Sequence, residues 1–267
     1  MSSSVYEKIK NASRIVVKVG TSTLTYQTGK MNIKRIDALS RTLSDLHNSG
    51  KDVVLVSSGA VGAAMGKLGI SERPREINIK QALAAVGQCE LMYLYDKLFS
   101  EYHNTVAQVL LTKDDISIPN RMENTKNTFK TLLDMGIIPV VNENDTVSIE
   151  ELEIGDNDNL SALVAEIVEA DLLILFSDID GLYDSDPHIN PDAKIIPLVK
   201  NIDDVSASAG GAGTKRGTGG MVTKLEAARR ATNAGINMII ANGNNISSLY
   251  DIIDGKNVGT LFVAKDI

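Results

Sequence analysis

The sequence predicts an α/β protein, a three-layer αβα sandwich around a central, mostly parallel sheet. Short apolar runs, such as residues 14–19 (RIVVKV), 52–56 (DVVLV) and 171–176 (DLLILF), alternate with longer segments whose apolar residues recur at helical spacing. The runs are nearly continuous, which is typical of parallel strands covered by helices on both faces. No linker rich in proline, glycine or serine divides the chain, so we expect residues 1–267 to form a single domain.

Turn and capping residues bound the expected elements. Asn32 is a good N-cap for a helix that ends before Gly50, where glycine suits the left-handed turn after a helix. The expected strands occupy residues 14–19, 52–56, 105–111, 137–141, 171–176, 236–241 and 258–263. The expected helices occupy the segment between Asn32 and Gly50, the small-residue stretch from residue 60, and residues 79–102, 120–135, 160–168, 221–234 and 245–253.

Composition excludes several classes of function. The net charge is −7 and the pI is about 5.1, which argues against nucleic acid as the main partner. No apolar run reaches the roughly 18 residues that a membrane helix needs, and the N-terminus has no apolar signal-peptide core. The single cysteine, Cys89, permits no intramolecular disulfide, and we expect it to be buried as a small hydrophobic residue. This usage suits a reducing cytoplasm.

Two clusters of amide and carboxylate side chains flank one loop in the middle of the chain. The expected strand 137–141 ends in Asn142-Glu143-Asn144-Asp145, and residues 155–159 (GDNDN) precede a helix. Open α/β sheets bind ligands beyond the carboxyl ends of their strands, so this loop is a candidate binding site. The alternative is that these residues only turn the chain and cap the helix. Two clusters around one loop favour the binding site.

A glycine-rich segment near the C-terminus suits phosphate binding. The chain has no GxxxxGK[ST] motif and no complete GxGxxG motif. Residues 217–224 (GTGGMVTK) instead run from glycines directly into an expected helix, where backbone N–H groups and the positive end of the helix can hold an oxyanion. Lys224, about one turn into the helix, could reach a phosphate. A flexible loop before a helix is the alternative interpretation.

Lys18 interrupts the apolar run of a strand that should be central. It is either a charge at an edge or end of the sheet, or a functional cation that needs a paired anion. Lys18, Lys224 and Asp158 together would suit phosphoryl transfer, with the lysines neutralising the transferring group and the carboxylate holding both ammonium groups. No general base is evident, and a carboxylate acceptor would need none.

Six segments stand out together: residues 16–22 (VVKVGTS), 56–60 (VSSGA), 141–145 (VNEND), 155–162 (GDNDNLSA), 180–187 (DGLYDSDP) and 217–224 (GTGGMVTK). They closely resemble the amino acid kinase family, and in particular its members that phosphorylate the γ-carboxylate of glutamate at the start of proline biosynthesis. Their order matches over nearly the whole chain, and the pair VNEND and GDNDN is the most specific part. The resemblance implies the amino acid kinase (carbamate kinase-like) fold.

The resemblance also implies roles for individual residues. It implies that Lys18 and Lys224 stabilise the transferring phosphoryl group and that Asp158 organises them. Glutamate would be bound by Ser58, Gly59, Asp145, Asp156 and Asn157. ATP would be bound by Lys18, Ser177, Asp178, Thr218, Gly219, Gly220, Met221, Val222, Thr223 and Lys224. Magnesium would be bridged mainly by ATP oxygens, so no protein ligand is expected for it. Proline is implied as a feedback inhibitor, and a homo-oligomer, a dimer or tetramer, is implied as the assembly.

Some features depart from the family pattern. Ser177 stands where threonine is expected, and Glu153 stands where lysine is common. Many relatives carry a C-terminal PUA domain, which we expect to be absent here because the chain stops at the end of the kinase domain. Residues 208–220, rich in glycine and including Lys215 and Arg216, are a candidate lid over ATP.

Two other functions stay open from the sequence. One is another amino acid kinase that phosphorylates N-acetylglutamate, aspartate or carbamate. The Asp and Asn clusters disfavour it, because an acylated amine offers no charge for Asp145 or Asp156 to pair with. The second is a kinase-like module that senses an amino acid or nucleotide without turnover, which the intact set of Lys18, Lys224 and Asp158 disfavours.

Overall fold

A computed structural model describes residues 2–26, 28–147, 157–187, 189–209 and 219–265 of the chain. Contacts within it fall into two units. The middle unit comprises Val19–Asn157, and the terminal unit comprises Met1–Lys18 together with Asp158–Ile267. The single-domain organisation stays a prediction.

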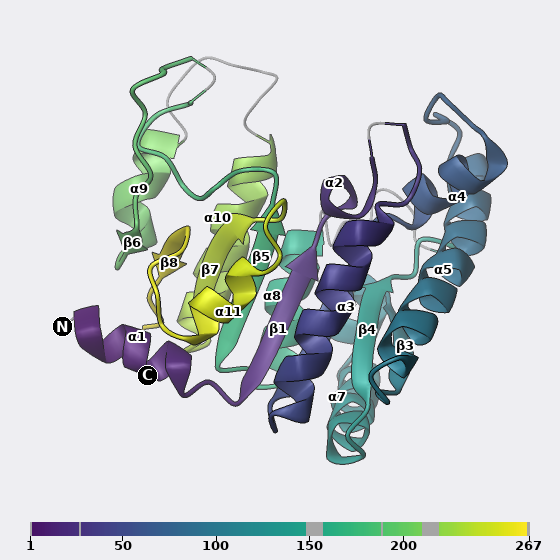
Figure 1. Ribbon diagram of the computed structural model, residues 1–267, viewed down its shortest axis with the longest axis horizontal. Coiled ribbons are helices and arrows are strands. Elements are labelled where there is room, and N and C mark those ends of the chain that lie inside the picture. The colour runs from purple at the N-terminus through teal and green to yellow at the C-terminus, as the bar shows by residue number, and fades with distance from the viewer. Residues whose placement is uncertain (1, 27, 148–156, 188, 210–218, 266–267) are drawn as a thin grey trace. The chain divides into compact units, whose positions relative to one another are not determined.

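The middle unit is built on three strands paired in parallel. β4 (Ile138–Glu143) lies between β2 (Asp52–Ser57) and β3 (Val106–Leu111), and Val140 lies opposite both Leu55 and Gln108. Its helices are α2 (Thr21–Leu24), α3 (Ile33–Asn48), α4 (Ala60–Leu68), α5 (Ile77–Ser100), α6 (Lys113–Ser117) and α7 (Pro119–Asp134). In this unit α3 lies in front of the strands and α7 behind them (Figure 1). Helices therefore cover both faces, as the buried apolar strands predict.

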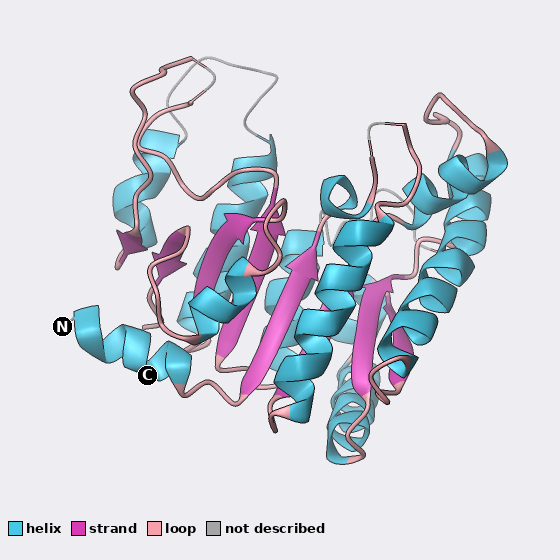
Figure 2. Cartoon of the chain, viewed as in Figure 1, coloured by secondary structure: helices cyan, strands magenta, loops and turns pink. Residues whose placement is uncertain are grey.

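The terminal unit contains the remaining strands, in the order β1-β5-β7-β8-β6. These are β1 (Arg14–Val19), β5 (Leu172–Ser177), β6 (Leu198–Val199), β7 (Asn237–Asn242) and β8 (Thr260–Phe262). β5 pairs with β7 in parallel, whereas β8 runs antiparallel to β7. The helices are α1 (Ser2–Lys10), α8 (Asn157–Ile167), α9 (Ile202–Ala209), α10 (Gly219–Asn233) and α11 (Ser248–Ile253) (Figure 2).

The predicted α/β class with a mostly parallel sheet is confirmed, and so are the residues that bound α3. The Asn32 side chain accepts a hydrogen bond from the Arg35 backbone N–H at 3.2 Å, so it caps α3 as predicted. Gly50, beyond the other end, has φ +93°, a left-handed conformation that glycine adopts without strain. Capping residues in the sequence thus correctly marked both ends of this helix.

α5 approaches the start of α4 closely, and this contact determines which face of α5 is buried. A Cβ atom added to Gly87 would stand 1.6 Å from the carbonyl oxygen of Ala60, so only glycine permits this contact. On the face of α5 that packs inward, Leu83, Gln88 and Leu91 are buried. Cys89 lies on the opposite face and is exposed, so the expectation that it is buried is wrong.

Candidate active site

A buried cluster of three charged side chains lies in the terminal unit. Lys18 comes from β1, Asp158 from the first turn of α8, and Lys224 from α10. Lys18 Nζ lies 2.6 Å from Asp158 Oδ1, and Lys224 Nζ donates a hydrogen bond to Asp158 Oδ2 at 2.9 Å. The structure therefore brings together all three residues predicted to act on the phosphoryl group. Lys18 is a buried and paired cation rather than an edge charge.

Electrostatics explains how the sheet tolerates these charges. Asp158 is fully buried, with an exposed fraction of 0%. Burial alone would raise the pKa of Asp158, but the ammonium groups of Lys18 and Lys224 outweigh it and hold that pKa below its usual range. The carboxylate is therefore ionised at neutral pH. Two ammonium groups face one carboxylate, so the cluster carries surplus positive charge and suits an anionic ligand.

The start of α10 is tied to this cluster. Lys224 Nζ donates a second hydrogen bond, at 3.1 Å, to the backbone carbonyl of Gly220, and the Thr223 hydroxyl donates to Asp158 Oδ2 at 3.2 Å. The glycine-rich helix start and the lysine cluster therefore belong to one site. Thr218 lies outside the described residues, as do most residues of the candidate lid, and Gly219 is the first residue of α10.

Polar side chains close β5 and β7 at the same end. The Ser177 hydroxyl, at the end of β5, donates to Asp178 Oδ1 at 3.0 Å. Asn242, at the end of the neighbouring β7, donates through Nδ2 to Asp180 Oδ1 at 2.6 Å. The Tyr183 hydroxyl donates to the other Asp180 oxygen at 3.1 Å. No role was predicted for Asn242 from the sequence, although a polar residue that closes an apolar strand was the available signal.

A second polar cluster lies in the middle unit. Asn157 Nδ2 donates to Ser58 Oγ at 2.7 Å and to Asn142 Oδ1 at 3.0 Å. Ser58 follows β2, and the next residue, Gly59, has φ +97°, which allows α4 to begin at once. The structure thus joins Ser58 and Asn157, two residues predicted to bind the acceptor. Asp156 and Glu153 lie outside the described residues.

Two side chains that support this second cluster, Gln88 and Tyr95, had no role predicted from the sequence. Asn142 belongs to the predicted strand-end cluster, and its Nδ2 donates to Gln88 Oε1 at 3.0 Å. The Tyr95 hydroxyl lies 2.8 Å from Ser57 Oγ. Gln88 and Tyr95 are both on the buried face of α5. A glutamine on the apolar face of a predicted helix was the only signal for Gln88.

Asp145 is a half-buried carboxylate just after β4. Burial is the largest influence and, together with the nearby Glu143 carboxylate, raises its pKa to about 6, while Arg73 acts in the opposite direction. The ionised carboxylate therefore predominates only above about pH 6, and burial makes that charged form costly. Protonation of Asp145 stabilises the folded protein. This contribution to the free energy of unfolding is fully present below the unfolded pKa and is lost as the pH rises through about 6. A cationic group beside Asp145 would relieve this cost.

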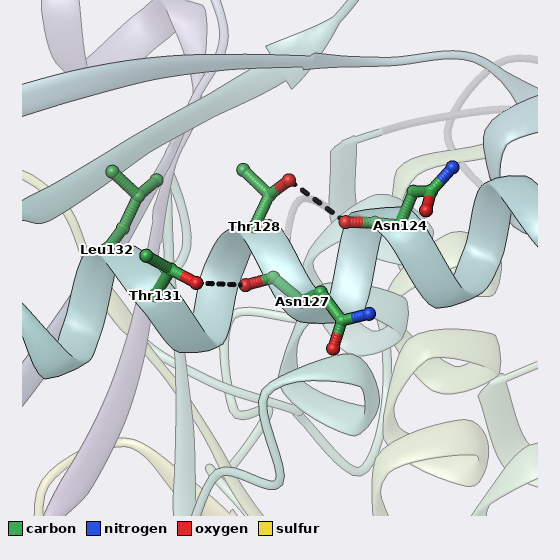
Figure 3. A pocket seen from close by; sticks show the side chains of 5 residues that line it. All are labelled: Asn124, Asn127, Thr128, Thr131 and Leu132. Carbon is green, nitrogen blue, oxygen red and sulfur yellow. Dashed lines mark hydrogen bonds between the residues drawn. The ribbon is translucent and has the colours of Figure 1, made fainter.

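A hollow of about 460 Å³ along α7 lacks the charged side chains of the candidate site. It is lined by Asn124, Asn127, Thr128, Thr131 and Leu132 (Figure 3). Its lining carries no charge, and the hydroxyls of Thr128 and Thr131 donate to carbonyls of their own helix, so we assign it no ligand.

Among the described residues, no three His, Cys, Asp or Glu side chains are grouped so that they could hold a metal ion. No helix in the described ranges combines the length and apolar character needed to cross a bilayer.

Comparison with known proteins agrees with this geometry. A family model described as the amino acid kinase family matches residues 13–242. The chain is 57% identical to the glutamate 5-kinase of Clostridium perfringens over 262 residues, which covers 96% of this chain and 97% of that protein. It is 54% identical to the glutamate 5-kinase of Clostridium acetobutylicum, with 97% of each chain covered. The fold resembles the crystal structure of UMP kinase from Bacillus anthracis, with a TM-score of 0.65 at 18% identity, over 96% of this chain and 97% of that one.

Proposed function

Because the chain belongs to the amino acid kinase family, we propose that it transfers the γ-phosphoryl group of ATP to the γ-carboxylate of L-glutamate. The product is L-glutamyl 5-phosphate, and the reaction is the first step of proline biosynthesis. The observation that carries the phosphoryl-transfer part is the buried cluster of Lys18, Asp158 and Lys224 with its surplus positive charge. The choice of glutamate follows relatives more than 50% identical that are named for it.

In the proposed reaction a γ-carboxylate oxygen of glutamate attacks the γ-phosphorus of ATP. The new bond joins carboxylate oxygen to phosphorus, the bond from phosphorus to the β,γ-bridging oxygen breaks, and ADP leaves. No base is needed, because the attacking carboxylate is already ionised. Lys18 and Lys224 neutralise charge on the phosphoryl oxygens, and Asp158 keeps both ammonium groups fixed before the substrate arrives.

We propose that the magnesium ion arrives as part of the MgATP substrate. A divalent magnesium ion prefers oxygen ligands, including phosphate oxygens and water. Asp158, the carboxylate at the centre of the lysine cluster, already has one oxygen against Lys18 and the other against Lys224. This carboxylate is therefore a lysine partner rather than a metal ligand. Ser177 and Asp178, the glycine-rich start of α10 and Thr218 form the proposed remainder of the ATP site.

On the acceptor side, the proposal assigns glutamate to Ser58, Gly59, Asp145, Asp156 and Asn157. Ser58 and the N–H groups near Gly59 suit a carboxylate, and the carboxylate of Asp145 suits the α-ammonium group. An acylated amine carries no positive charge and would leave Asp145 unpaired, which disfavours N-acetylglutamate. This assignment predicts a strong preference for a substrate with a free amine.

Hydroxamate formation tests the proposed reaction directly, because hydroxylamine traps an acyl phosphate before it cyclises or hydrolyses. With MgATP, we expect signal with L-glutamate and none above background with N-acetylglutamate or L-aspartate. Signal with N-acetylglutamate alone would contradict the assignment of Asp145 to the α-ammonium group, and signal with L-aspartate alone would contradict the choice of glutamate. Either result would keep the phosphoryl machinery. No signal with any acceptor would instead support a sensor without turnover.

The pKa of Asp145 predicts how glutamate affinity depends on pH. Glutamate needs the ionised carboxylate, so KM for glutamate should rise about tenfold for each pH unit below about 6, while KM for MgATP changes little. Steady-state kinetics between pH 5 and 8 measures both constants. Asp145→Asn should raise KM at neutral pH and abolish this pH dependence. An unchanged slope in Asp145→Asn would assign the titration to another group.

The proposal extends to regulation, assembly and location. Proline as a feedback inhibitor, a homo-oligomeric assembly and a cytoplasmic location all follow from the resemblance to the family. They stay predictions. Inhibition of hydroxamate formation by added proline, with glutamate held near its KM, tests the first of them.

A further inference from the structure

A series of hydrogen-bonded side-chain amides, two of them buried, leads from α5 to the acceptor residues of the middle unit. Gln88 Oε1 accepts a hydrogen bond from Asn142 Nδ2 at 3.0 Å, and Asn142 Oδ1 accepts one from Asn157 Nδ2 at 3.0 Å. Asn157 Nδ2 in turn donates to Ser58 Oγ at 2.7 Å. Gln88 and Asn142 are 8% and 3% exposed, so water has little access to them. We call this hydrogen-bonded series of side chains the amide relay; its members are Gln88, Asn142, Asn157 and Ser58.

Two backbone groups fix the direction of the relay. The Glu143 backbone N–H donates to Asn142 Oδ1 at 2.9 Å, and a backbone N–H can only donate. The Ser57 backbone carbonyl accepts from Asn157 Nδ2 at 3.3 Å, and a carbonyl can only accept. The amides of Asn142 and Asn157 can therefore each take one orientation. In that orientation Asn142 turns its NH₂ group toward Gln88, which must supply an acceptor.

We propose that Gln88 is a positioning residue for the glutamate site, a role that rests on the proposed function. By accepting a hydrogen bond from Asn142, Gln88 holds the Asn142 oxygen toward Asn157. The Asn157 NH₂ group then donates its hydrogen bonds to groups of the protein rather than to substrate. Asn157 then presents its oxygen, which suits the α-ammonium group of glutamate. The Ser58 oxygen accepts from Asn157, so its hydroxyl proton is directed to a substrate carboxylate.

The packing of α5 gives Gln88 a fixed place from which to act. Gly87, its neighbour, lets the helix approach the Ala60 carbonyl more closely than any side chain would allow. Two turns further along, the Tyr95 hydroxyl meets Ser57 Oγ at 2.8 Å. α5 therefore contacts the acceptor cluster at two points, through Gln88 to Asn142 and through Tyr95 to Ser57. Without Gln88, the buried Asn142 NH₂ group would lack this acceptor and its amide would lose its fixed orientation.

The test replaces Gln88 with methionine, which is similar in size and cannot accept a comparable hydrogen bond. We expect Gln88→Met to raise KM for L-glutamate about tenfold, with kcat within about threefold and KM for MgATP unchanged. Gln88→Glu keeps an acceptor oxygen and should lie closer to the parent KM. Leu83→Met, a buried substitution on the same helix outside the relay, is the matched control and should leave both KM values unchanged.

A second measurement reads the relay without substrate. Hydrogen exchange of the side-chain NH₂ groups of Asn142 and Asn157, followed by ¹⁵N NMR, should be at least about tenfold faster in Gln88→Met than in the parent or in Leu83→Met. A parent enzyme inactive with glutamate would overturn the proposed function, while faster exchange would still support the positioning of both amides. Unchanged exchange, or KM for glutamate within twofold of the parent, would overturn the role of Gln88.

Discussion

Replacing Lys18 with methionine is expected to lower kcat about a thousandfold while glutamate affinity stays within about twofold of the parent. Lys18 Nζ lies 2.6 Å from Asp158, and both side chains are buried. The substitution removes one of the two ammonium groups proposed to neutralise the transferring phosphoryl group. Lys224 remains hydrogen-bonded to Asp158, so no uncompensated charge is left behind and the fold should persist. Hydroxamate kinetics and calorimetric titration with glutamate measure the two quantities.

Lys256→Met is the matched control in the same unit. Lys256 pairs with Asp251 at 2.6 Å, but both side chains are largely exposed, and surface ion pairs contribute little to stability. We expect its kcat and KM values to match the parent. If Lys18→Met also turned over at a near-normal rate, the role of Lys18 in phosphoryl transfer would be wrong. If the affinity of Lys18→Met for glutamate also fell, the substitution would have disturbed the glutamate site as well as the phosphoryl-transfer site.

The sequence predicted the main strands and long helices because their signals are local. Continuous apolar runs marked β1, β2 and β5, and caps such as Asn32 marked helix ends. Short elements were missed because two to nine residues carry too little periodicity; these are α1, α2, α6, β6 and α9. The antiparallel direction of β8 was also not predictable from its own residues, since pairing depends on the path of the chain before it.

The sequence predicted those site residues that are unusual for their place in a strand or helix. Lys18 within an apolar strand required a buried partner, and Asp158 at a helix start was one of few candidates. Gln88 is not unusual in this way, since one glutamine in a helix of 24 residues is ordinary. Its importance comes from the approach of α5 to α4, which depends on Gly87 and Ala60 meeting in space. Contacts of this kind depend on packing, and no spacing in the sequence marks them.

Replacing Asp158 with asparagine is expected to lower the free energy of unfolding by about 3–5 kcal/mol at neutral pH. The substitution keeps the shape but removes the negative charge between two buried lysines, and breaking a buried ion pair from one side has costs of this size. Asparagine can accept from only one lysine with its oxygen, and its NH₂ group would face the other. Urea unfolding with an unchanged m-value measures the difference. Asp203→Asn, which breaks an exposed pair with Arg229, is the control and should cost less than about 1 kcal/mol.

The pH dependence of that difference separates charge from packing. The pKa of Asp158 is depressed in the folded protein, so the stability it contributes is present above the unfolded pKa of about 4 and is lost as the pH falls toward the folded pKa. The parent therefore loses this advantage in acid, whereas Asp158→Asn has none to lose. Unfolding free energies of the two proteins should converge as the pH falls from about 5 to 3. A difference that stays constant over this range would assign the loss to packing and would contradict the electrostatic role of Asp158.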